Sequence, residues 1–510
     1  MTSNAAPTAP SDRQEEQSFA QHLHLLRKRP SQDELLETTT SPIFTMPVLK
    51  ITEKSLSQGA PEPFPQYGLL GGLVDVLQNK EQSILRNELH NDQDPRIFFN
   101  VAAPSSTFIC GSQGSGKSHT LSCLLENCLS RSDAGPLPKP LTGIVFHYDT
   151  FISDDGGSPC EAAFLSSNPQ IQRTYQRLNV QVEPLQINDF DLNTKRMIEI
   201  MAIDNSETVP LYVHTLYRIL REMRVVQQEA GGKFSYREFK RQVMDSGLSP
   251  AQLGPLNQRL DTLESFMPRA QVDRTPANTK KKTQKGKHSI TKSGWDSKPG
   301  WLTIVDLSCP CVTPESACSL FNVCLSLFIE QSMAAGRVIA LDEAHKYMGD
   351  SAEALTLTNT LLSIIRLQRH LGARIIISTQ EPTISPTLLD LCSITIAHRF
   401  TSPKWLRSLK GHLAAVATNE PQLESGAECD DADENEHRGS YSKGRAAERI
   451  FGEIVRLRVG EALLFAPTAI VGLNFVSDST TATKTLGTDF IKIRVRNRLT
   501  TDGGKSVMAI

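Results

Sequence analysis

The sequence predicts an α/β protein in which helices cover both faces of a mainly parallel sheet, and three observations support this fold class. Short apolar runs alternate with stretches of helical periodicity in residues 61–187 and again in 301–423. One strand-to-helix junction, at 111–118, spells GSQGSGKS, a complete phosphate-binding loop. Residues 188–273, between the two parts, show helical periodicity without strand signals, which indicates a helical insert.

The composition limits the classes of partner and compartment. With 54 Lys and Arg against 56 Asp and Glu, the bulk charge does not require nucleic acid, so any DNA contact must come from a local patch or an oligomer's channel. The ten cysteines form no regular framework, which favours reduced thiols in an intracellular protein, cytoplasmic or nuclear. Cys309, Cys311, Cys318 and Cys324 allow a zinc site, but structural cysteines are favoured because the spacing lacks a C-x-x-C pair. No apolar run reaches ~18 residues, so we expect no membrane span.

Polar segments flank and interrupt the predicted core. Residues 1–60 are rich in Ser, Thr, Gln, Glu and Pro, which predicts a disordered N-terminal tail with one helix near 15–29. Residues 274–300 form a lysine-rich linker, for which a nuclear-import signal, a nucleic-acid tether and a solvated loop all remain open. Residues 424–443 predict an acidic surface loop.

The sheet is built from short apolar runs on both sides of the insert. We expect strands at 106–110, 143–149, 301–307, 337–341, 374–378 and 394–398, with 444–510 completing the core through strands at 461–466 and 490–495. Helices are expected at 119–129, at about 317–331 and at 352–371, the last ending before Gly372. Ligands of such sheets bind at the carboxyl ends of the strands, where all the motifs below fall.

The phosphate loop stands in the context that its chemistry requires. A buried strand precedes it and a helix follows it, so a helix N-terminus points at the phosphates. Lys117 can reach the β- and γ-phosphates of ATP, and the hydroxyl of Ser118 can ligate Mg²⁺. The nucleotide-binding residues that we expect are Gly111, Ser112, Gln113, Gly114, Ser115, Gly116, Lys117, Ser118 and His119.

Two acidic residues at the end of the strand 337–341 predict the other half of the site. Asp342 is placed to hold Mg²⁺, directly or through water, opposite Ser118. Glu343 follows at once, and since successive strand side chains face opposite ways, it reaches the nucleotide only where the strand end frays. There it can orient and deprotonate the attacking water. An ordinary acidic strand end is the alternative.

Further polar residues follow the next apolar strands. Gln380 could sense the γ-phosphate or position the attacking water, with a capping role as the alternative. Arg366, Arg369 and Arg399 are candidates for an arginine finger that acts on the site of a neighbouring subunit, and Arg399 is favoured because it ends a strand. Surface ion pairing is the alternative for each arginine.

Together these motifs resemble those of the HerA–FtsK superfamily of P-loop ATPases, and of its HerA-like branch in particular. The segments that carry the resemblance stand in the family's order: GSGKSHT at 114–120, LTIVDLS at 302–308, LDEAHKY at 341–347, RHLGAR at 369–374, STQEP at 378–382 and GEALLF at 460–465. The resemblance implies a RecA-like ATPase core that assembles as a ring, usually a hexamer, with nucleotide sites between subunits. Members of the family typically use ATP to move DNA, and sometimes protein, through the ring.

The resemblance also implies roles for single residues. Lys117 and Ser118 would contact phosphate and Mg²⁺, Asp342 would be the second metal ligand, Glu343 the base and Gln380 the sensor.

Two features depart from the family pattern. Residues 46–100 are too short and too poor in strands for the N-terminal β-barrel of HerA-type proteins, and HYD at 147–149 replaces the acidic motif usual after the second strand. These departures concern the translocated polymer and a nuclease partner rather than the ATPase.

Two functions from different classes remain open. One is a ring-forming ATPase motor acting on DNA, and the other is a nucleotide-dependent switch whose helical insert binds a protein partner. The DEAH spelling at 342–345 is also that of DEAH-box RNA helicases, but the 130 residues after Gln380 leave no room for their second RecA-like domain. Arg494, Arg496 and Arg498 alternate on a late strand and could line a ring channel, with a solvated edge face as the alternative.

Overall fold

The computed structural model of the chain describes residues 22, 38–54, 62–79, 94–150, 160–166, 181, 183–201, 211–272, 295, 298–331, 336–382, 384–412, 437–477 and 480–501. Residues 424–436 of the expected acidic loop, most of the lysine-rich linker and, except for residue 22, the helix expected near 15–29 lie outside these ranges. The rest of the expected loop, residues 437–443, is helical instead, because α18 (His437–Arg456) begins there.

The described residues build one thirteen-stranded sheet. Along it the strands run in the order β12 (Thr480–Thr485), β11 (Ile470–Ser477), β1 (Ile43–Thr45), β3 (Arg96–Asn100), β2 (Tyr67–Leu73), β13 (Ile491–Val495), β10 (Glu461–Phe465), β9 (Ile394–His398), β4 (Ser106–Cys110), β8 (Ala373–Thr379), β7 (Arg337–Leu341), β5 (Thr142–His147) and β6 (Leu302–Asp306). From β9 to β6 all neighbours are parallel. The predicted parallel α/β core is confirmed, and β8 separates the phosphate-loop strand β4 from the acidic strand β7.

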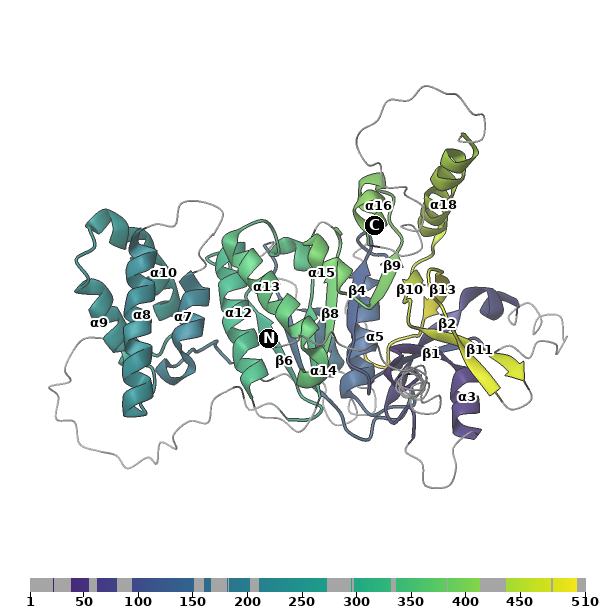
Figure 1. The fold of residues 1–510 in the computed structure, drawn as a ribbon, viewed down its shortest axis with the longest axis horizontal. Coiled ribbons are helices and arrows are strands. Elements are labelled where there is room, and N and C mark those ends of the chain that lie inside the picture. The colour runs from purple at the N-terminus through teal and green to yellow at the C-terminus, as the bar shows by residue number, and fades with distance from the viewer. Residues whose placement is uncertain are drawn as a thin grey trace, which may run out of the picture.

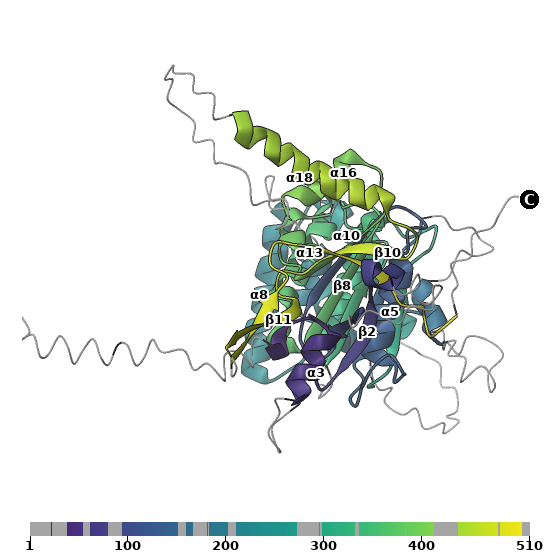
Figure 2. The same cartoon turned by 90° about the vertical axis from the view of Figure 1, so that its right-hand side faces the viewer.

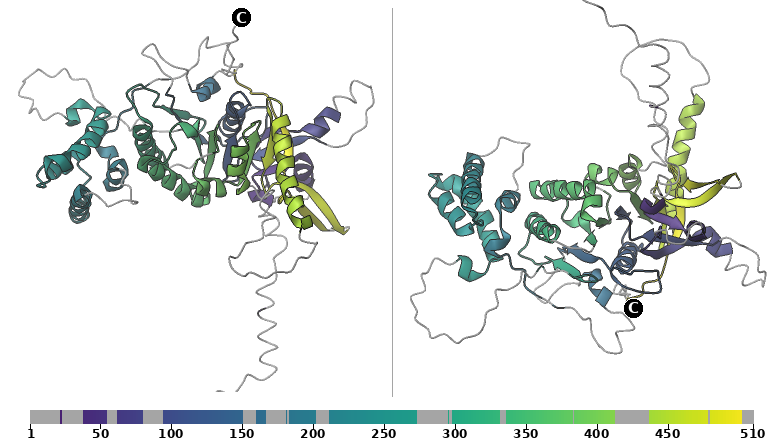
Figure 3. Two further views of the ribbon diagram at one scale, coloured as in Figure 1. Left: turned by 90° about the horizontal axis from the view of Figure 1, so that it is seen from above. Right: turned by 60° about the horizontal axis from the view of Figure 1, so that its bottom comes forward.

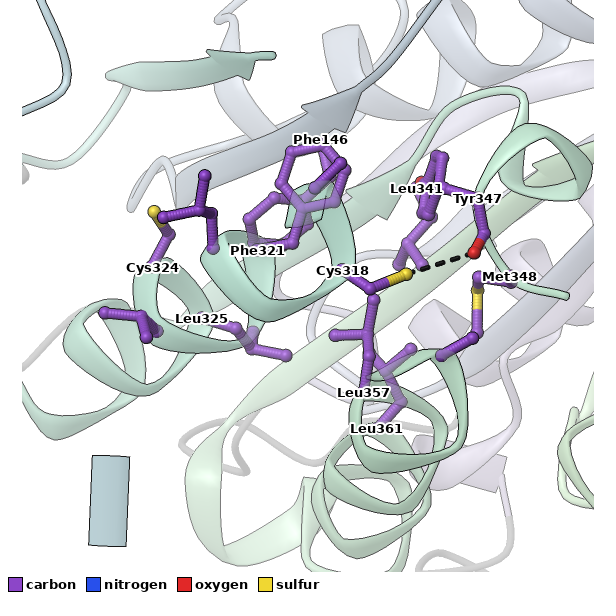
Figure 4. Packing of buried hydrophobic residues seen from close by; sticks show 14 of the residues in the cluster. Phe146, Cys318, Phe321, Cys324, Leu325, Leu341, Tyr347, Met348, Leu357 and Leu361 are labelled. Atoms are coloured by element: carbon purple, nitrogen blue, oxygen red, sulfur yellow. Dashed lines mark hydrogen bonds between the residues drawn. The ribbon is translucent and has the colours of Figure 1, made fainter. Parts of the chain in front are cut away.

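Helices cover both faces of this parallel part. On one face lies α5 (Lys117–Leu129), and on the other lie α12 (Pro314–Glu330) and α13 (Ala352–Arg366). Alternate residues of β5 separate the two layers, since Phe146 packs with α12 and Val145 packs with α5. The rings of Phe146 and Phe321 are 5.0 Å apart in the α12 layer, which Figure 4 shows together with Leu341.

The helical insert lies at the end of the sheet beyond β6 (Figure 1). It consists of α7 (Thr194–Met201), α8 (Leu211–Ala230), α9 (Tyr236–Met244), α10 (Pro250–Ser265) and α11 (Arg269–Val272), as predicted from the periodicity. The hydroxyl of Ser235 caps α9 by accepting from the backbone N–H of Glu238, and Pro250 begins α10. Helix α7 packs against α12, so the insert shares its apolar cluster with the core. Figure 3 shows the teal helices of the insert beside the core in two further views.

The long helix expected at 352–371 is two helices. Helix α13 ends at Arg366, and α14 (Gln368–Leu371) follows after Leu367. The end at Gly372 is as predicted, because this residue adopts the left-handed conformation with φ 57°. The remaining short elements are α3 (Met46–Lys54), η1 (Glu161–Ser166), η2 (Asp189–Asp191), η3 (Ala344–Lys346), α15 (Pro386–Asp390), α16 (Pro403–Lys410) and α18 (His437–Arg456).

Beyond β9 the sheet continues in mostly antiparallel strands from both ends of the chain (Figures 1 and 2). This extension corrects the prediction of a disordered tail for residues 1–60, because β1 and α3 lie within that range. Strand β1 pairs with β3 through Phe44 and Phe98, and the rings of Phe44 and Phe64 stack at 3.9 Å. The stacked aromatic rings anchor this segment, and the polar composition of residues 1–60 gave no sign of it.

Candidate nucleotide-binding and catalytic site

The predicted site residues gather at one edge of the sheet. The phosphate loop follows β4, Asp342 and Glu343 follow β7, and Gln380 follows β8. Because β4, β8 and β7 are parallel neighbours, their carboxyl ends meet at this edge, where ligands of such sheets bind.

The phosphate loop has the backbone that a phosphate cradle needs. Gly114 and Gly116 have φ values of 71° and 113°, which side chains with a Cβ rarely adopt. A Cβ at Gly114 would meet nothing within 4 Å, so open space lies in front of the loop. Helix α5 begins at Lys117, directly after the loop, and points its unpaired N–H groups toward this space.

Neighbouring segments hold the loop in place. The backbone N–H of Ser112 donates to the carbonyl of Arg399 at 2.9 Å, which ties the loop to the end of β9. The N–H of Gly460, before β10, donates to the carbonyl of Ser115 at 3.3 Å. Within the loop, the Oγ of Ser115 and the Nζ of Lys117 donate to the carbonyl of Ser112 at 2.7 and 3.0 Å.

Lys117 is buried and interacts with the acidic pair. Burial lowers the pKa of its ammonium, and the carboxylates of Glu343 and Asp342 oppose that shift. A phosphate beside this ammonium would favour its charged form further, which suits a site for polyphosphate.

His119 uses its ring elsewhere. The Nε2 atom lies 2.8 Å from the carbonyl oxygen of Arg496, in the C-terminal segment. If His119 contacts the nucleotide as predicted, it does so through its backbone N–H at the start of α5.

A buried histidine that the sequence analysis did not single out supports the loop from below. His398 ends β9, and its Nδ1 donates to the carbonyl of Glu461 at 2.9 Å, because a carbonyl can only accept. The Nε2 therefore accepts from the hydroxyl of Thr120 at 2.8 Å. Burial lowers the pKa of His398 to about 4, so the ring is neutral at pH 7. Its polar position in an apolar strand was the available signal.

Asp342 carries an oxygen that fits a cation. Its Oδ2 accepts from the Nδ1 of His147 at 3.2 Å, whereas Oδ1 is buried and has no hydrogen-bond partner. A buried carboxylate oxygen is costly without a partner, and a divalent cation beside it would remove that cost. Ser118, the second predicted ligand, is half-buried in the first turn of α5. These two oxygen donors fit Mg²⁺.

The proton on His147 responds to the same carboxylate. Burial lowers the pKa of His147, but the hydrogen bond with Asp342 and the charge of that residue raise it by more, so the pKa lies above its ordinary value. His147 thus takes the place at the end of β5 where the family pattern has an acidic motif, and it binds the acid of β7.

Glu343 turns toward the site through an unusual backbone. With φ 48° and ψ 44°, it is the one non-glycine residue of positive φ in the described ranges. Such a conformation costs on the order of 1–3 kcal/mol and occurs preferentially at functional sites. The Oε2 of Glu343 accepts from the Nε2 of Gln380 at 3.1 Å and lies 3.4 Å from the Nδ1 of His345. The structure therefore brings the predicted base and the predicted sensor together.

The arginine candidates lie at two edges of the sheet. Arg399 is exposed beside the phosphate loop of its own chain, because its carbonyl accepts from Ser112. Arg366 and Arg369 are also exposed, but they precede Gly372 and the start of β8. They therefore lie at the opposite edge, away from their own site.

The arginines that were expected to line a ring channel form ion pairs within their own chain, which corrects that expectation. Strand β13 ends at Val495, so the strand alternation does not extend to all three arginines. Arg496 pairs with the fully buried Glu126 of α5 at 2.8 Å, and the side chain of Arg498 is 3% exposed and pairs with Glu161. Arg494 lies 3.8 Å from Glu461.

The cysteines that allowed a zinc site do not gather. Cys309 and Cys311 are exposed, whereas Cys318 and Cys324 are buried in α12. The Sγ of Cys318 donates to the carbonyl of Tyr347 at 3.0 Å (Figure 4). The favoured structural role thus suits the two buried cysteines.

No protein-family model matches this chain, and no curated protein matches it. Solved structures of similar fold include VirB4 of Thermoanaerobacter pseudethanolicus, at 13% identity and a TM-score of 0.44, over 77% of this chain and 89% of that one. The plasmid coupling protein TrwB, solved with ADP and Mg²⁺, matches at 14% identity and a TM-score of 0.38, over 87% and 98%. The genome packaging NTPase B204 from Sulfolobus turreted icosahedral virus 2, with AMPPCP, matches at 10% identity and a TM-score of 0.27, over 75% and 97%.

Because the identities and TM-scores are low, we assign the P-loop fold from the chain's own strand order and phosphate loop. Among the described helices, none has the length and apolarity needed to cross a membrane.

Proposed function

We propose that this chain is a Mg²⁺-dependent ATPase of the HerA–FtsK superfamily that assembles as a ring and moves DNA. The observation that carries the ATPase is the convergence of Lys117, Asp342, Glu343 and Gln380 beside a glycine-rich loop at one edge of the sheet. Phosphoryl transfer needs positioned positive charge, a metal ligand and an oriented water, and these four residues supply such groups.

Each residue has a separate task in this proposal. The loop N–H groups and the ammonium of Lys117 bind the β- and γ-phosphates. Ser118 and Asp342 would hold Mg²⁺, which neutralises phosphate charge when bound. Glu343 orients a water whose oxygen attacks the γ-phosphorus and accepts its proton, while the bond to the β–γ bridging oxygen breaks and ADP leaves. Gln380 holds the carboxylate of Glu343 in place.

The ATPase proposal is tested by steady-state hydrolysis of MgATP. We expect Glu343→Gln to lower kcat by about 10²–10⁴-fold, the usual contribution of a general base. Lys117→Ala should abolish turnover, whereas the matched change at the exposed Lys139 should leave it unchanged. Turnover by Glu343→Gln at the wild-type rate would show that another group is the base.

The proposal of a ring depends on where the candidate arginine fingers lie. An arginine that acts on a neighbouring subunit must face away from its own nucleotide, and Arg366 and Arg369 meet this condition at the opposite edge of the sheet. Arg399 is better placed to act within its own chain. Such an arginine offsets charge in the transition state and contributes ~10³–10⁵ in rate.

A second candidate function is a nucleotide-dependent switch that binds a protein through the insert. It is favoured by two apolar side chains on α8, because Val225 and Val226 are 47% and 61% exposed. The buried pairs of Arg496 and Arg498 remove one argument for a DNA channel.

Hydrolysis with and without single- and double-stranded DNA separates the two functions, with the oligomer mass measured in parallel. A rise in kcat with DNA and a ring-sized mass support the motor. A rate that DNA does not change, at any mass, favours the switch.

A further inference from the structure

Three potential metal ligands meet on the side of Asp342 that faces β5. They are His147 at the end of β5, Cys160 just before η1, and Asp342 itself, and all three are buried. One ligand atom from each lies within 4.8 Å of the others. The group is separate from the cysteines of 309–324. It joins two residues that are near each other in the sequence, His147 and Cys160, with Asp342, which is 195 positions from His147.

His147 and Asp342 already lie at a spacing that suits a shared cation. The Nδ1 of His147 and the Oδ2 of Asp342 are 3.2 Å apart, and because a carboxylate can only accept, Nδ1 carries the proton of this hydrogen bond. A cation that replaces this proton would bind Nδ1 and the carboxylate, since metal binding releases protons from its ligands. The Oδ1 of Asp342 is buried without a hydrogen-bond partner and would gain one in the same cation.

We propose that His147, Cys160 and Asp342 form a binding site for a thiophilic divalent cation, of which Zn²⁺ is the natural example. Thiolate, imidazole and carboxylate are the ligands of zinc, and three protein ligands with one open position are typical of its non-structural sites. Small rotations of the side chains would reduce the spacing to the roughly 3.5 Å edges of a tetrahedral site. Mg²⁺ takes oxygen ligands and keeps its waters, so a thiolate site excludes it.

The site has a consequence for hydrolysis that rests on the proposed function. Asp342 would serve both cations, so Zn²⁺ bound through Cys160 withdraws this carboxylate from Mg²⁺. Zinc should then inhibit hydrolysis without occupying the phosphate loop.

The test uses the full chain without nucleotide, with Cys309, Cys311 and Cys429 replaced by serine to remove other accessible or undescribed thiols. This parent is titrated with Co²⁺, whose bond to a thiolate gives an absorption band in the near ultraviolet. We expect one equivalent to bind with this band and to be displaced by Zn²⁺. The band should disappear in Cys160→Ala and persist in Cys324→Ala, which removes an equally buried thiol from α12.

A parent that shows no thiolate band, or a Cys160→Ala variant that keeps it, would overturn the metal site. Circular dichroism of each variant establishes that it is folded before titration. In hydrolysis assays, Zn²⁺ should inhibit the parent and not Cys160→Ala. Since the cobalt band needs no ATP, a chain that does not hydrolyse ATP would refute the proposed function and leave the band as the measure of this site.

Discussion

The residues of the site differ in how well the neighbouring sequence predicts them. The phosphate loop is contiguous, so the octet predicted its residues and the helix that follows them. The pairing of Glu343 with Gln380 could be expected only in outline, because their contact depends on adjacent strands. The contacts of His398 join β9, α5 and β10, and the sequence shows only that a polar residue ends an apolar strand.

His398 should make the stability of the protein depend on pH. Its pKa is about 4 in the folded chain against an ordinary 6.5, so the unfolded state alone takes up a proton between these values. Stability contributed by the neutral ring is therefore complete above pH 6.5 and is lost as the pH falls toward 4. Between pH 7 and pH 5 the wild type should lose about 2 kcal/mol more than His398→Asn.

Urea unfolding at several pH values measures this difference. The matched control is His214→Asn on the exposed face of α8, which should keep the wild-type dependence. An identical pH dependence for His398→Asn and wild type would contradict the neutral, buried ring.

Elements were predictable where their sequence is apolar and continuous. The parallel strands β4, β5, β7, β8 and β9 are such runs, and each was expected within two residues of its bounds. Among the strands beyond β9, β10 and β13 were expected, whereas β1, β2, β3, β11 and β12 were missed, and for three of these the physical reason is plain. Strand β2 contains three glycines, β12 reads TTATKT without apolar alternation, and β1 has three residues whose partners lie far along the chain. Pairing across such distances leaves no periodic signal.

The C-terminal segment should stabilise α5 through a buried ion pair. Burial raises the pKa of Glu126, but the hydrogen bond from Thr500 and the charge of Arg496 outweigh it, so the carboxylate stays charged. Arg496→Met leaves that charge unpaired and should cost about 3 kcal/mol in unfolding free energy.

Replacing both partners tests that the cost comes from the unpaired charge. Glu126→Gln combined with Arg496→Met should recover part of the loss in urea unfolding. Arg241→Met breaks an exposed pair with Glu238 and should change little. A fully additive double variant would contradict the pairing.

At the scale of the whole molecule, the alternation of strands and helices predicted the core, while the use of the termini was unexpected. Strands from residues 43–100 and 461–495 join in one sheet with the core, and the segment after β13 contacts the helix of the phosphate loop. Arg496 therefore binds the chain's own α5, and Arg498 pairs with Glu161 of η1. A sequence shows that such side chains alternate, but not which surface covers them.

The central claim is that this fold binds a magnesium-bound nucleoside triphosphate at the loop after β4. The most direct measurement is calorimetric titration of the folded Glu343→Gln chain with MgATP, since this variant should bind without turnover. We expect saturable binding that approaches one nucleotide per chain and disappears when Lys117→Ala is added. A folded Glu343→Gln chain that takes up no MgATP, or that binds it equally well without Lys117, would show that the loop is not a nucleotide site.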